Sequence, residues 1–503
     1  MNRALTLLIF SFALYSTICA QSKGSFSGSF QSTSQYYFND GSILPGELAK
    51  KWGSNNYLKL NYTIGNFSTG AQYEAYFPPL SGFPYQLKGN SLTGKFIRYS
   101  KKRFDITAGS YFEQFGNGLI FRAYESRELG INTSLEGFRS IIYPLKSLKI
   151  TGIIGKQREF LKVSNNLIKG IDFDYSLDSF SNRGLSLNFG FGYVSKYEKY
   201  SGTEENIPLS VNATSFRASF SDKNFNINSE IAFKSFDPTV GNNYDNVRGS
   251  SLLINSSWYK KGFGMFLSVR YLNNMEFRNR RESEGIYGQI NYLPSNTKQH
   301  SYLLPNLYPY ATQNCEISAQ GEVSFKVNKT DVKLNVAQVR TIESNNLLFQ
   351  DINLEIRAKL APKLKSVFTF VNLLYDKGAL EAPIYDFVRS NIVITDFYYR
   401  VTNLVSINTQ LQHLWTNQDH GNWAALLLQI GYAPHWRVFI SEMTDYRYVE
   451  REDYLNAGLG YTSRFGDISI GYGKQKEGLV CAGGVCRRVP AYKGFEVKFN
   501  VNF

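Results

Sequence analysis

The sequence has few cysteines, prolines and methionines, and it has no long apolar run beyond its first twenty residues. Its 503 residues include 4 Cys, 4 Met and 14 Pro. The longest later apolar run, WAALLL at 423–428, is far below the ~18 residues that a membrane helix needs. This absence excludes a helical membrane span and leaves two classes, a soluble exported protein or a membrane β-barrel.

Aromatic residues are plentiful, although the chain is not hydrophobic on average. Aromatics make up 16% of the residues, with 35 Tyr and 38 Phe, while the mean hydropathy is −0.29. Many aromatics in a chain of this polarity favour amphipathic strands over one large dry core.

The sequence also has no pattern that predicts a further domain or a catalytic site. An alternation of apolar and polar residues, typical of β-strands, begins almost directly after 21–24. We therefore expect no plug domain like the one that precedes the barrel of TonB-dependent transporters. The pattern continues to Phe503, so we expect no peptidoglycan-binding domain after it. The four histidines have no recognisable catalytic setting, and the sequence therefore predicts no enzyme and no cofactor.

The charge of the chain is strongly positive, with a formal net charge of +14. No basic stripe with a reading motif is present, so we expect no nucleic-acid partner. The charge is expected to spread over wet faces and loops. The alternatives are a lumen that attracts anions and contact with anionic lipid headgroups.

The first twenty residues have the features of a targeting segment. Arg3 precedes an apolar run over 5–15, and the small residue Ala20 follows. We therefore predict a secretory signal peptide over 1–20 and a mature chain over 21–503. Cleavage before Cys19, as in a lipoprotein, is disfavoured because the bulky residue Ile18 precedes that cysteine.

Strict alternation of apolar and polar residues recurs along the chain. In FEVKFNVNF, residues 495–503, apolar side chains occupy every odd position and polar ones every even position. The segments 225–233, 317–327 and 352–360 repeat the pattern, and each polar face carries charges. Alternation predicts strands with one apolar and one polar face. Because an unpaired charge cannot face a dry interior without a large cost, the polar faces must meet water.

Connections of two lengths alternate between these strands. Short polar turns are predicted near 65–67, 101–103, 144–147, 221–223, 260–262, 328–330, 361–363 and 433–435. Longer connections are predicted near 38–54, 79–90, 114–133, 159–167, 197–208, 237–247, 275–313, 376–388 and 475–491. Tight periplasmic turns and long outer loops are typical of transmembrane barrels, which this pattern favours over a soluble sandwich. The sequence therefore predicts an all-β, antiparallel transmembrane barrel of about 24 strands, with every proline in a connection.

The ends of the predicted strands carry features expected of membrane insertion. Tyr and Trp cluster there, as in the aromatic girdles of barrels; aromatic-rich strands without a girdle are the alternative. The last predicted strand places Phe499, Val501 and Phe503 on its apolar face. This ending resembles the C-terminal insertion signal that the barrel-assembly machinery reads. The first strand is expected at 24–37, where it would close the sheet against the last.

Three stretches resemble an uncharacterised family, a domain of unknown function, of large outer-membrane barrels from Bacteroidota. They are YFEQFGNGLIFRAYESRELG (111–130), INYLPSNTKQHSYLLPNLYPYATQ (290–313) and VCAGGVCRRVPAYKGF (480–495). The resemblance covers nearly the whole mature chain. It implies a barrel in the outer membrane, and it implies no activity.

Two of the four cysteines are expected to pair. Cys481 and Cys486 bracket AGGV, whose glycines allow a tight loop. In an oxidising compartment this spacing predicts a small disulfide ring in an outer loop, against the alternatives of free thiols or half a metal site. No histidine lies nearby, and no metal is predicted. Cys315 is expected to be an unpaired, small apolar filler.

The connection 275–313 is the loop most suggestive of function. Its first part is rich in charge and its last part in Pro and Tyr. Long loops without clear elements are usually functional or disordered, and aromatics argue against disorder. We expect it to fold inward as a plug or to cap the pore, in company with 114–133. Arg278, Arg280, Arg281 and Glu284 would then form a charged constriction; a solvated surface loop is the alternative.

Two functions compete at this point. The first is a porin-like channel for hydrophilic solutes in the outer membrane. The second is a non-transporting barrel that acts as a scaffold or accessory subunit of an outer-membrane assembly or secretion complex. The expected partners are outer-membrane lipid and lipopolysaccharide, the barrel-assembly machinery during insertion, and envelope proteins in the scaffold case.

Overall fold

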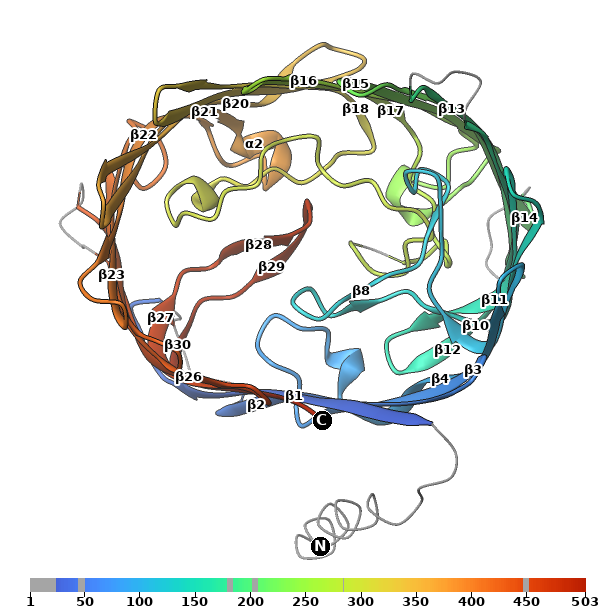
Figure 1. The fold of residues 1–503 in the computed structure, drawn as a ribbon, viewed down its shortest axis with the longest axis horizontal. Coiled ribbons are helices and arrows are strands. Elements are labelled where there is room, and N and C mark those ends of the chain that lie inside the picture. Colours follow the sequence, from blue (N-terminus) through green and yellow to red (C-terminus); the bar gives the residue numbers. More distant parts are fainter. Residues whose placement is uncertain (1–23, 44–49, 179–183, 201–206, 284, 447–451) are drawn as a thin grey trace, which may run out of the picture.

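A computed structural model shows a closed β-barrel. It describes residues 24–43, 50–178, 184–200, 207–283, 285–446 and 452–503. Within these residues, 24 antiparallel strands form one sheet that closes on itself (Figure 1). The predicted fold class, an all-β antiparallel barrel of this size, is confirmed. Among the described residues, no helix is long and apolar enough to cross a membrane.

The wall of the barrel follows the order of the chain. Its strands are β1 (Ser25–Phe38), β2 (Trp52–Ile64), β3 (Phe67–Tyr76), β4 (Gly89–Lys101), β5 (Phe104–Tyr111), β10 (Leu135–Leu145), β11 (Leu148–Glu159), β12 (Lys162–Asp178), β13 (Ser186–Tyr197), β14 (Ser210–Ser221), β15 (Phe225–Lys234), β16 (Gly249–Lys260), β17 (Phe263–Asn273), β18 (Cys315–Val327), β19 (Thr330–Thr341), β20 (Leu347–Ala361), β21 (Leu364–Asp376), β22 (Phe387–Arg400), β23 (Val405–Trp415), β24 (Trp423–Tyr432), β25 (Trp436–Asp445), β26 (Asp453–Ser463), β27 (Gly466–Gln475) and β30 (Tyr492–Asn502).

The first and last strands close the wall. β1 pairs with β30 from Ser29↔Asn502 to Phe38↔Lys493. The backbone N–H of Phe503 also donates to the carbonyl of Gly28 at 2.9 Å. Closure removes the two edges that an open sheet would expose.

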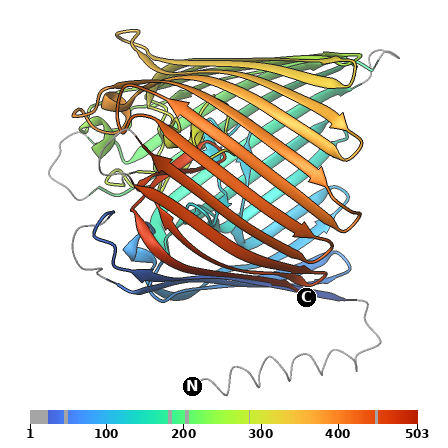
Figure 2. The same cartoon turned by 90° about the vertical axis from the view of Figure 1, so that its left-hand side faces the viewer.

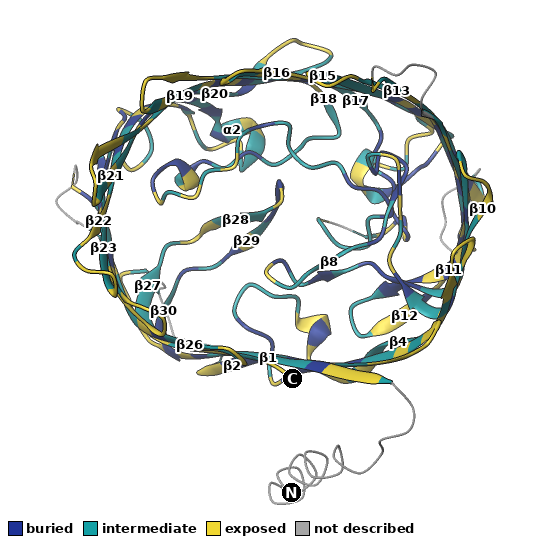
Figure 3. Cartoon of the chain, viewed as in Figure 1, coloured by how far each residue is buried: buried dark blue, intermediate teal, exposed yellow. Residues whose placement is uncertain are grey.

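Apolar and polar side chains lie on opposite faces of the wall, as the alternation predicts. In β19, Leu334 and Val336 are each 41% exposed, whereas the alternate residues Asn335 and Ala337 are buried. Figure 3 shows buried, intermediate and exposed residues mixed along the ring of strands, and many buried residues in the loops within it. The outer face is therefore an apolar belt, and the polar face lines the lumen.

Tight turns lie at one end of the barrel and longer loops at the other, and we call these ends the short-turn end and the long-loop end (Figure 2). The described chain begins and ends at the short-turn end. One expected long connection, 159–167, is wrong. β11 and β12 are joined there by a tight turn at 160–161, because both strands continue pairing to Glu159↔Lys162 past an irregularity.

One proline departs from the expectation that every proline lies in a connection. Pro144 lies inside β10, two residues from the short turn. The register of β10 with β11 shifts between Ile142 and Leu145. A proline that cannot donate is tolerated at such an irregularity, where the hydrogen-bond ladder is already interrupted.

The long-loop end carries the remaining elements, and most of them lie within the ring in the view down the barrel (Figure 1). They are η1 (Tyr85–Leu87), β6 (Gln114–Phe115), β7 (Phe121–Arg122), β8 (Glu125–Ser126), β9 (Ile131–Asn132), η2 (Val240–Asn242), η3 (Pro305–Leu307), α2 (Lys377–Leu380), β28 (Gly478–Ala482) and β29 (Val485–Val489). These pieces are short because they are parts of loops held by the wall and by one another.

Candidate functional site

The connection between β17 and β18 (274–314) lies along the inner surface of the wall. Near its start, the backbone carbonyl of Asn279 accepts a hydrogen bond from the side-chain amide of Asn166 in β12, at 2.6 Å. Farther on, His300 Nε2 lies 2.8 Å from the Asp351 carboxylate of β20. Leu304 donates its N–H to Gln412 of β23, at 3.1 Å. The loop therefore contacts the lumen face from β12 round to β23, and it folds inward rather than extending into solvent.

Apolar packing fixes the first half of this loop. Met275, Phe277 and Ile290 are fully buried in a cluster that also holds Phe115 and Phe121 from the connection between β5 and β10 (112–134). The cluster rests on lumen-facing residues of neighbouring strands, namely Leu135, Ile153, Ile168, Val194, Val211, Ala213, Ala232 and Leu272. The two loops thus share one core with the wall, as expected if 112–134 accompanies 275–313.

The second half of the loop is held by buried tyrosines. Tyr308 and Tyr310 pack in a cluster with Phe349, Tyr375 and other lumen-facing residues. The Tyr308 hydroxyl donates to Asp419 at 3.0 Å, and the Tyr310 hydroxyl donates to Glu316. Burial raises the pKa of both hydroxyls well above the usual value, so each remains a hydrogen-bond donor at physiological pH.

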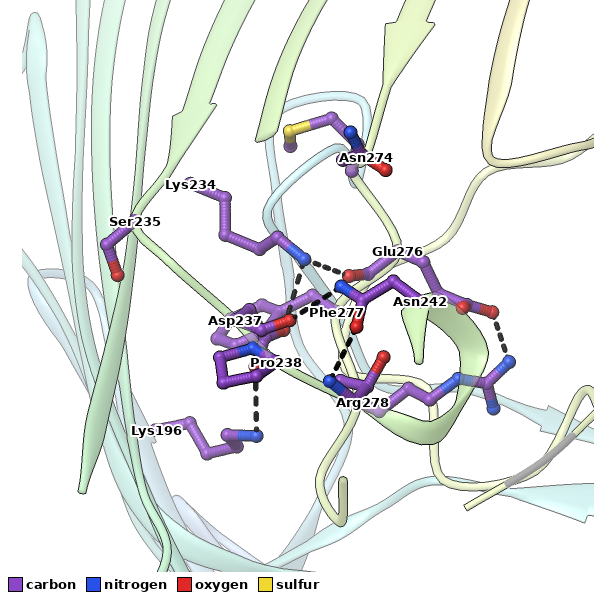
Figure 4. Close-up of polar contacts among 12 residues, drawn as sticks. Lys196, Lys234, Ser235, Asp237, Pro238, Asn242, Asn274, Glu276, Phe277 and Arg278 are labelled. Carbon is purple, nitrogen blue, oxygen red and sulfur yellow. Dashed lines mark hydrogen bonds and ion pairs between the residues drawn. The ribbon is translucent and has the colours of Figure 1, made fainter. Parts of the chain in front are cut away.

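An ionic network binds the loop to the wall, and Figure 4 shows its part around Lys196, Lys234 and Asp237. Asp237 lies 3.0 Å from Lys234 Nζ, 3.6 Å from Lys196 Nζ and 3.6 Å from Arg281 Nη1. Glu198 lies 3.1 Å from Lys196 and 3.3 Å from Arg281. The side chains of Lys196, Asp237 and Arg281 are completely buried. Three cations and two carboxylates thus share a site without access to solvent, and each depends on the others for its charge to be tolerated.

The residues predicted to form a constriction have different surroundings. Arg281 lies within the ionic network and also donates to the carbonyl of Pro238 at 3.2 Å. Arg278 is buried, pairs with Glu276 and donates to the carbonyl of Tyr287. Arg280 is 47% exposed and lies 3.3 Å from Glu159. In this conformation Arg281 anchors the loop to its neighbours, Arg278 holds parts of the loop to each other, and Arg280 is the arginine of the three that meets solvent.

The fourth residue of that set, Glu284, lies outside the described residues. The three arginines do not converge on one opening. A charged constriction at this place therefore stays a prediction, and its best-placed candidate is Arg280.

The predicted disulfide joins the two strands of the β28–β29 hairpin. Cys481 and Cys486 are partners in the hairpin register and are bonded, with an S–S distance of 2.01 Å. Gly483 and Gly484 form the tip, each with positive φ, which glycine adopts without strain. The hairpin belongs to the connection between β27 and β30 at the long-loop end, and it points across the ring of strands (Figure 1).

The tip and second strand of this hairpin contact three other loops. Gly484 accepts a hydrogen bond from Ser295 N at 3.2 Å. Arg487 donates to the carbonyls of Glu128, at 3.0 Å, and Gly82, at 2.9 Å. Val485 packs in a buried cluster with residues of 112–134 and 274–314. The connections 77–88, 112–134 and 274–314 therefore meet at the hairpin, and together with it we call them the lumen plug.

Cys315 lies at the start of β18, outside any disulfide, as expected. Its thiol is 3.5 Å from the side-chain oxygen of Asn274, so its neighbours are polar and its expected role as an apolar filler is incomplete. Among the described residues, no group of three or more His, Cys, Asp or Glu side chains could hold a metal ion.

The lumen wall beyond the plug is polar and partly exposed. Toward the short-turn end, Glu322, Lys333 and Arg357 have side chains that are 30%, 41% and 56% exposed. A hollow of about 240 Å³ near the same end has Arg437 and Asp467 in its lining. Exposed charges on an inward face require water, so this part of the lumen is wet.

Lys196, Glu198, Lys234 and Asp237 were missed by the sequence reasoning. Each stands at the end of a strand or just after it, where a charged residue looks like an ordinary surface group. The two lysines fall on lumen-facing positions of the alternation, which is the only signal that could have found them. Their burial depends on a loop that joins the wall farther along the chain.

Several solved structures are similar to this barrel in fold. The barrel is similar to the siderophore receptor PirA from Pseudomonas aeruginosa, with 9% identity, 96% of this chain and 81% of that chain covered, and a TM-score of 0.43. It is also similar to the translocation pore of the P pilus usher PapC (8% identity, 95% and 99% covered, TM-score 0.45). A third similar structure is OccAB3 from Acinetobacter baumannii (9% identity, 96% and 100% covered, TM-score 0.36).

No curated protein sequence matches this one. A model of one protein family matches residues 1–503. The chain belongs to the family described as "Family of unknown function (DUF6029)".

Proposed function

We propose that the chain is an outer-membrane transport barrel that carries hydrophilic solutes through a lumen closed, in this conformation, by its own loops. The observation that carries the proposal is the combination of a polar, partly exposed lumen wall with a plug built from four connections. Large barrels with water-filled lumens conduct solutes unless an internal element obstructs them. Here the obstruction is made of loops, each of which could move without unfolding the wall.

The outer membrane is the location that fits the barrel. Its outward face is apolar, which suits lipid, and its strands are long enough to cross the bilayer. The predicted signal peptide, 1–20, would direct export, and lies outside the described residues. The long-loop end would face outward, in contact with lipopolysaccharide, and the short-turn end would face the periplasm.

A second function, a non-transporting scaffold, is favoured by the number of bonds that hold the plug. The buried ionic network and the two apolar clusters are what a permanently closed lumen would have. In that case the exposed loops would bind subunits of an envelope complex, and no solute would pass.

Deleting the main plug loop tests the channel. The N–H of Asn274 donates to the carbonyl of Asn314 at 3.0 Å, so the two ends of the loop adjoin and a deletion of 276–312 leaves a short turn. We expect wild-type protein to conduct in brief events in planar bilayers and to swell liposomes in small sugars. The deletion variant should conduct continuously, with a mean current larger by roughly tenfold or more, because the lumen of a wide barrel is then unobstructed.

Two controls define the outcome. The deletion variant must remain a folded barrel, shown by faster migration of unheated than of heated samples in gel electrophoresis. A wild-type protein that never conducts at any voltage, and that copurifies with envelope proteins, would support the scaffold and contradict the channel.

Phe503 tests the predicted recognition by the barrel-assembly machinery. Its ring lies 6.3 Å from the ring of Phe26, and its backbone bonds to Gly28 do not need the side chain. We expect Phe503→Ala to reduce the folded protein in outer membranes several-fold, while the purified variant refolds in detergent like the wild type. Asn502→Ala is the matched control, and equal membrane levels for both variants would contradict a role for Phe503 as an insertion signal.

A further inference from the structure

The β28–β29 hairpin is attached to the wall at a single place. It leaves β27 after Gln475 and returns at Tyr492 of β30, and these two residues are register partners. Gly478, the first residue of β28, has open space around its backbone. The hairpin is therefore a short arm that can swing about its base without separating any pair of wall strands.

The hairpin is also where the other plug connections meet. Loops 77–88, 112–134 and 274–314 leave the wall at three different positions. Arg487 joins the first two of these loops through the carbonyls of Gly82 and Glu128, and its guanidinium lies 4.1 Å from the centre of the Phe83 ring. Withdrawal of this one side chain would remove both of these hydrogen bonds and leave the two loops with only their direct contacts, such as that of Phe83 with Gly130.

The loop 274–314 contacts the tip of the hairpin and the region of the disulfide. Tyr292 donates its hydroxyl to the carbonyl of Gly483, and Ser295 donates to Gly484 at 3.2 Å. The Cys486 sulfur lies 3.8 Å from the carbonyl of Tyr310. These contacts fall on the tip and on the start of β29. They can all be made at once only while this part of the hairpin keeps one shape.

The disulfide is what gives so short a hairpin a fixed shape. An isolated pair of five-residue strands is marginally stable in water. The bond between Cys481 and Cys486 closes a small ring and removes most of the alternative conformations of the tip. Cys481 is partly exposed and Cys486 is buried, so the bond can be attacked from the Cys481 side.

We propose that the β28–β29 hairpin is the latch of the lumen plug, and that its disulfide holds the latch closed. The proposal rests on the proposed transport function. A dithiol reductant would transfer two electrons and two protons, so that the one S–S bond becomes two thiols and the dithiol becomes a disulfide. The hairpin then loses its fixed shape, its contacts with the three loops weaken, and the plug opens more often.

The test compares oxidised and reduced full-length protein in planar bilayers. We expect wild-type protein with dithiothreitol, and the Cys481→Ser/Cys486→Ser variant without it, to open more often than oxidised wild type, by on the order of tenfold. Dithiothreitol should not change the double variant further. Cys315→Ser is the matched control and should behave like oxidised wild type.

A second measurement makes the latch testable without any current. In the double variant, the backbone amides of 112–134 and 274–314 should exchange hydrogen for deuterium faster, by the same factor by which the plug opens more often. The amides of the wall strands should keep their exchange rates. Unchanged exchange in both loops would overturn the latch. If the 276–312 deletion conducts but the double variant neither conducts nor exchanges faster, the latch is wrong and the channel stands. If no form of the protein with an intact loop conducts, but exchange quickens, the latch stands and the channel is wrong.

Discussion

Replacing Asp237 with asparagine should lower the free energy of unfolding of the barrel by about 3–5 kcal/mol. Asparagine keeps the size of the side chain, removes the charge and replaces one acceptor oxygen with an NH2 donor. Lys196 and Arg281 would then keep Glu198 as their acidic partner, and Lys234 would lose its ion pair with Asp237. A buried charge without a counter-charge costs far more than the pair contributes, because water cannot reach the site to solvate it.

Urea titration of the protein in lipid vesicles, followed by tryptophan fluorescence, measures this loss. Asp331→Asn is the matched control, because Asp331 pairs with Lys326 at 3.8 Å while both side chains are more than half exposed. The control should change stability by about 1 kcal/mol or less. Equal effects of the two substitutions would show that the network around Asp237 is solvated, and would contradict its role as an anchor of the plug.

Placing an arginine on the outer face of the wall should also be strongly destabilising. Val336 lies on the apolar face of β19, 41% exposed, opposite Gly321 of β18 and Ile352 of β20. If that face meets lipid, Val336→Arg should cost about 2–4 kcal/mol near the bilayer midplane. The measurement is the same urea titration in vesicles.

Ser324→Arg supplies the matched substitution on the inner face. Ser324 lies on the polar side of β18, opposite Gly264, which leaves room for a longer side chain. An arginine there reaches the wet lumen near Glu322, so we expect a change below about 1 kcal/mol. If Ser324→Arg were the more damaging of the two, the assignment of the lipid and lumen faces would be reversed.

The alternation of residues was enough to predict the wall. Segments such as 352–360 and 495–503 pair an apolar face with a charged one, and the alternation of short and long connections between them favours a barrel with water inside over a sandwich. The limits appear at particular places. The connection at 159–167 looked long because polar residues continue through it, yet both strands keep pairing to Glu159↔Lys162. Pairing depends on the neighbouring strand, which the local sequence does not describe.

The inward position of 275–313 could be predicted in outline, but its contacts could not. Arg281 was expected to line a pore because it is one of several charges in a loop. Its partners, Glu198 and Asp237, come from two other loops, and only the closed ring brings the three together. The disulfide between Cys481 and Cys486 followed from spacing, whereas the contacts of its hairpin with Gly82 and Glu128 did not.

By itself, then, the sequence determined which residues form strands and which face of each strand is apolar, because those properties depend on neighbours two positions away. The tertiary structure alone decided what fills the lumen. Loops from distant parts of the chain meet there because the closed ring brings them together, and charges that look exposed in the sequence are buried and paired among them.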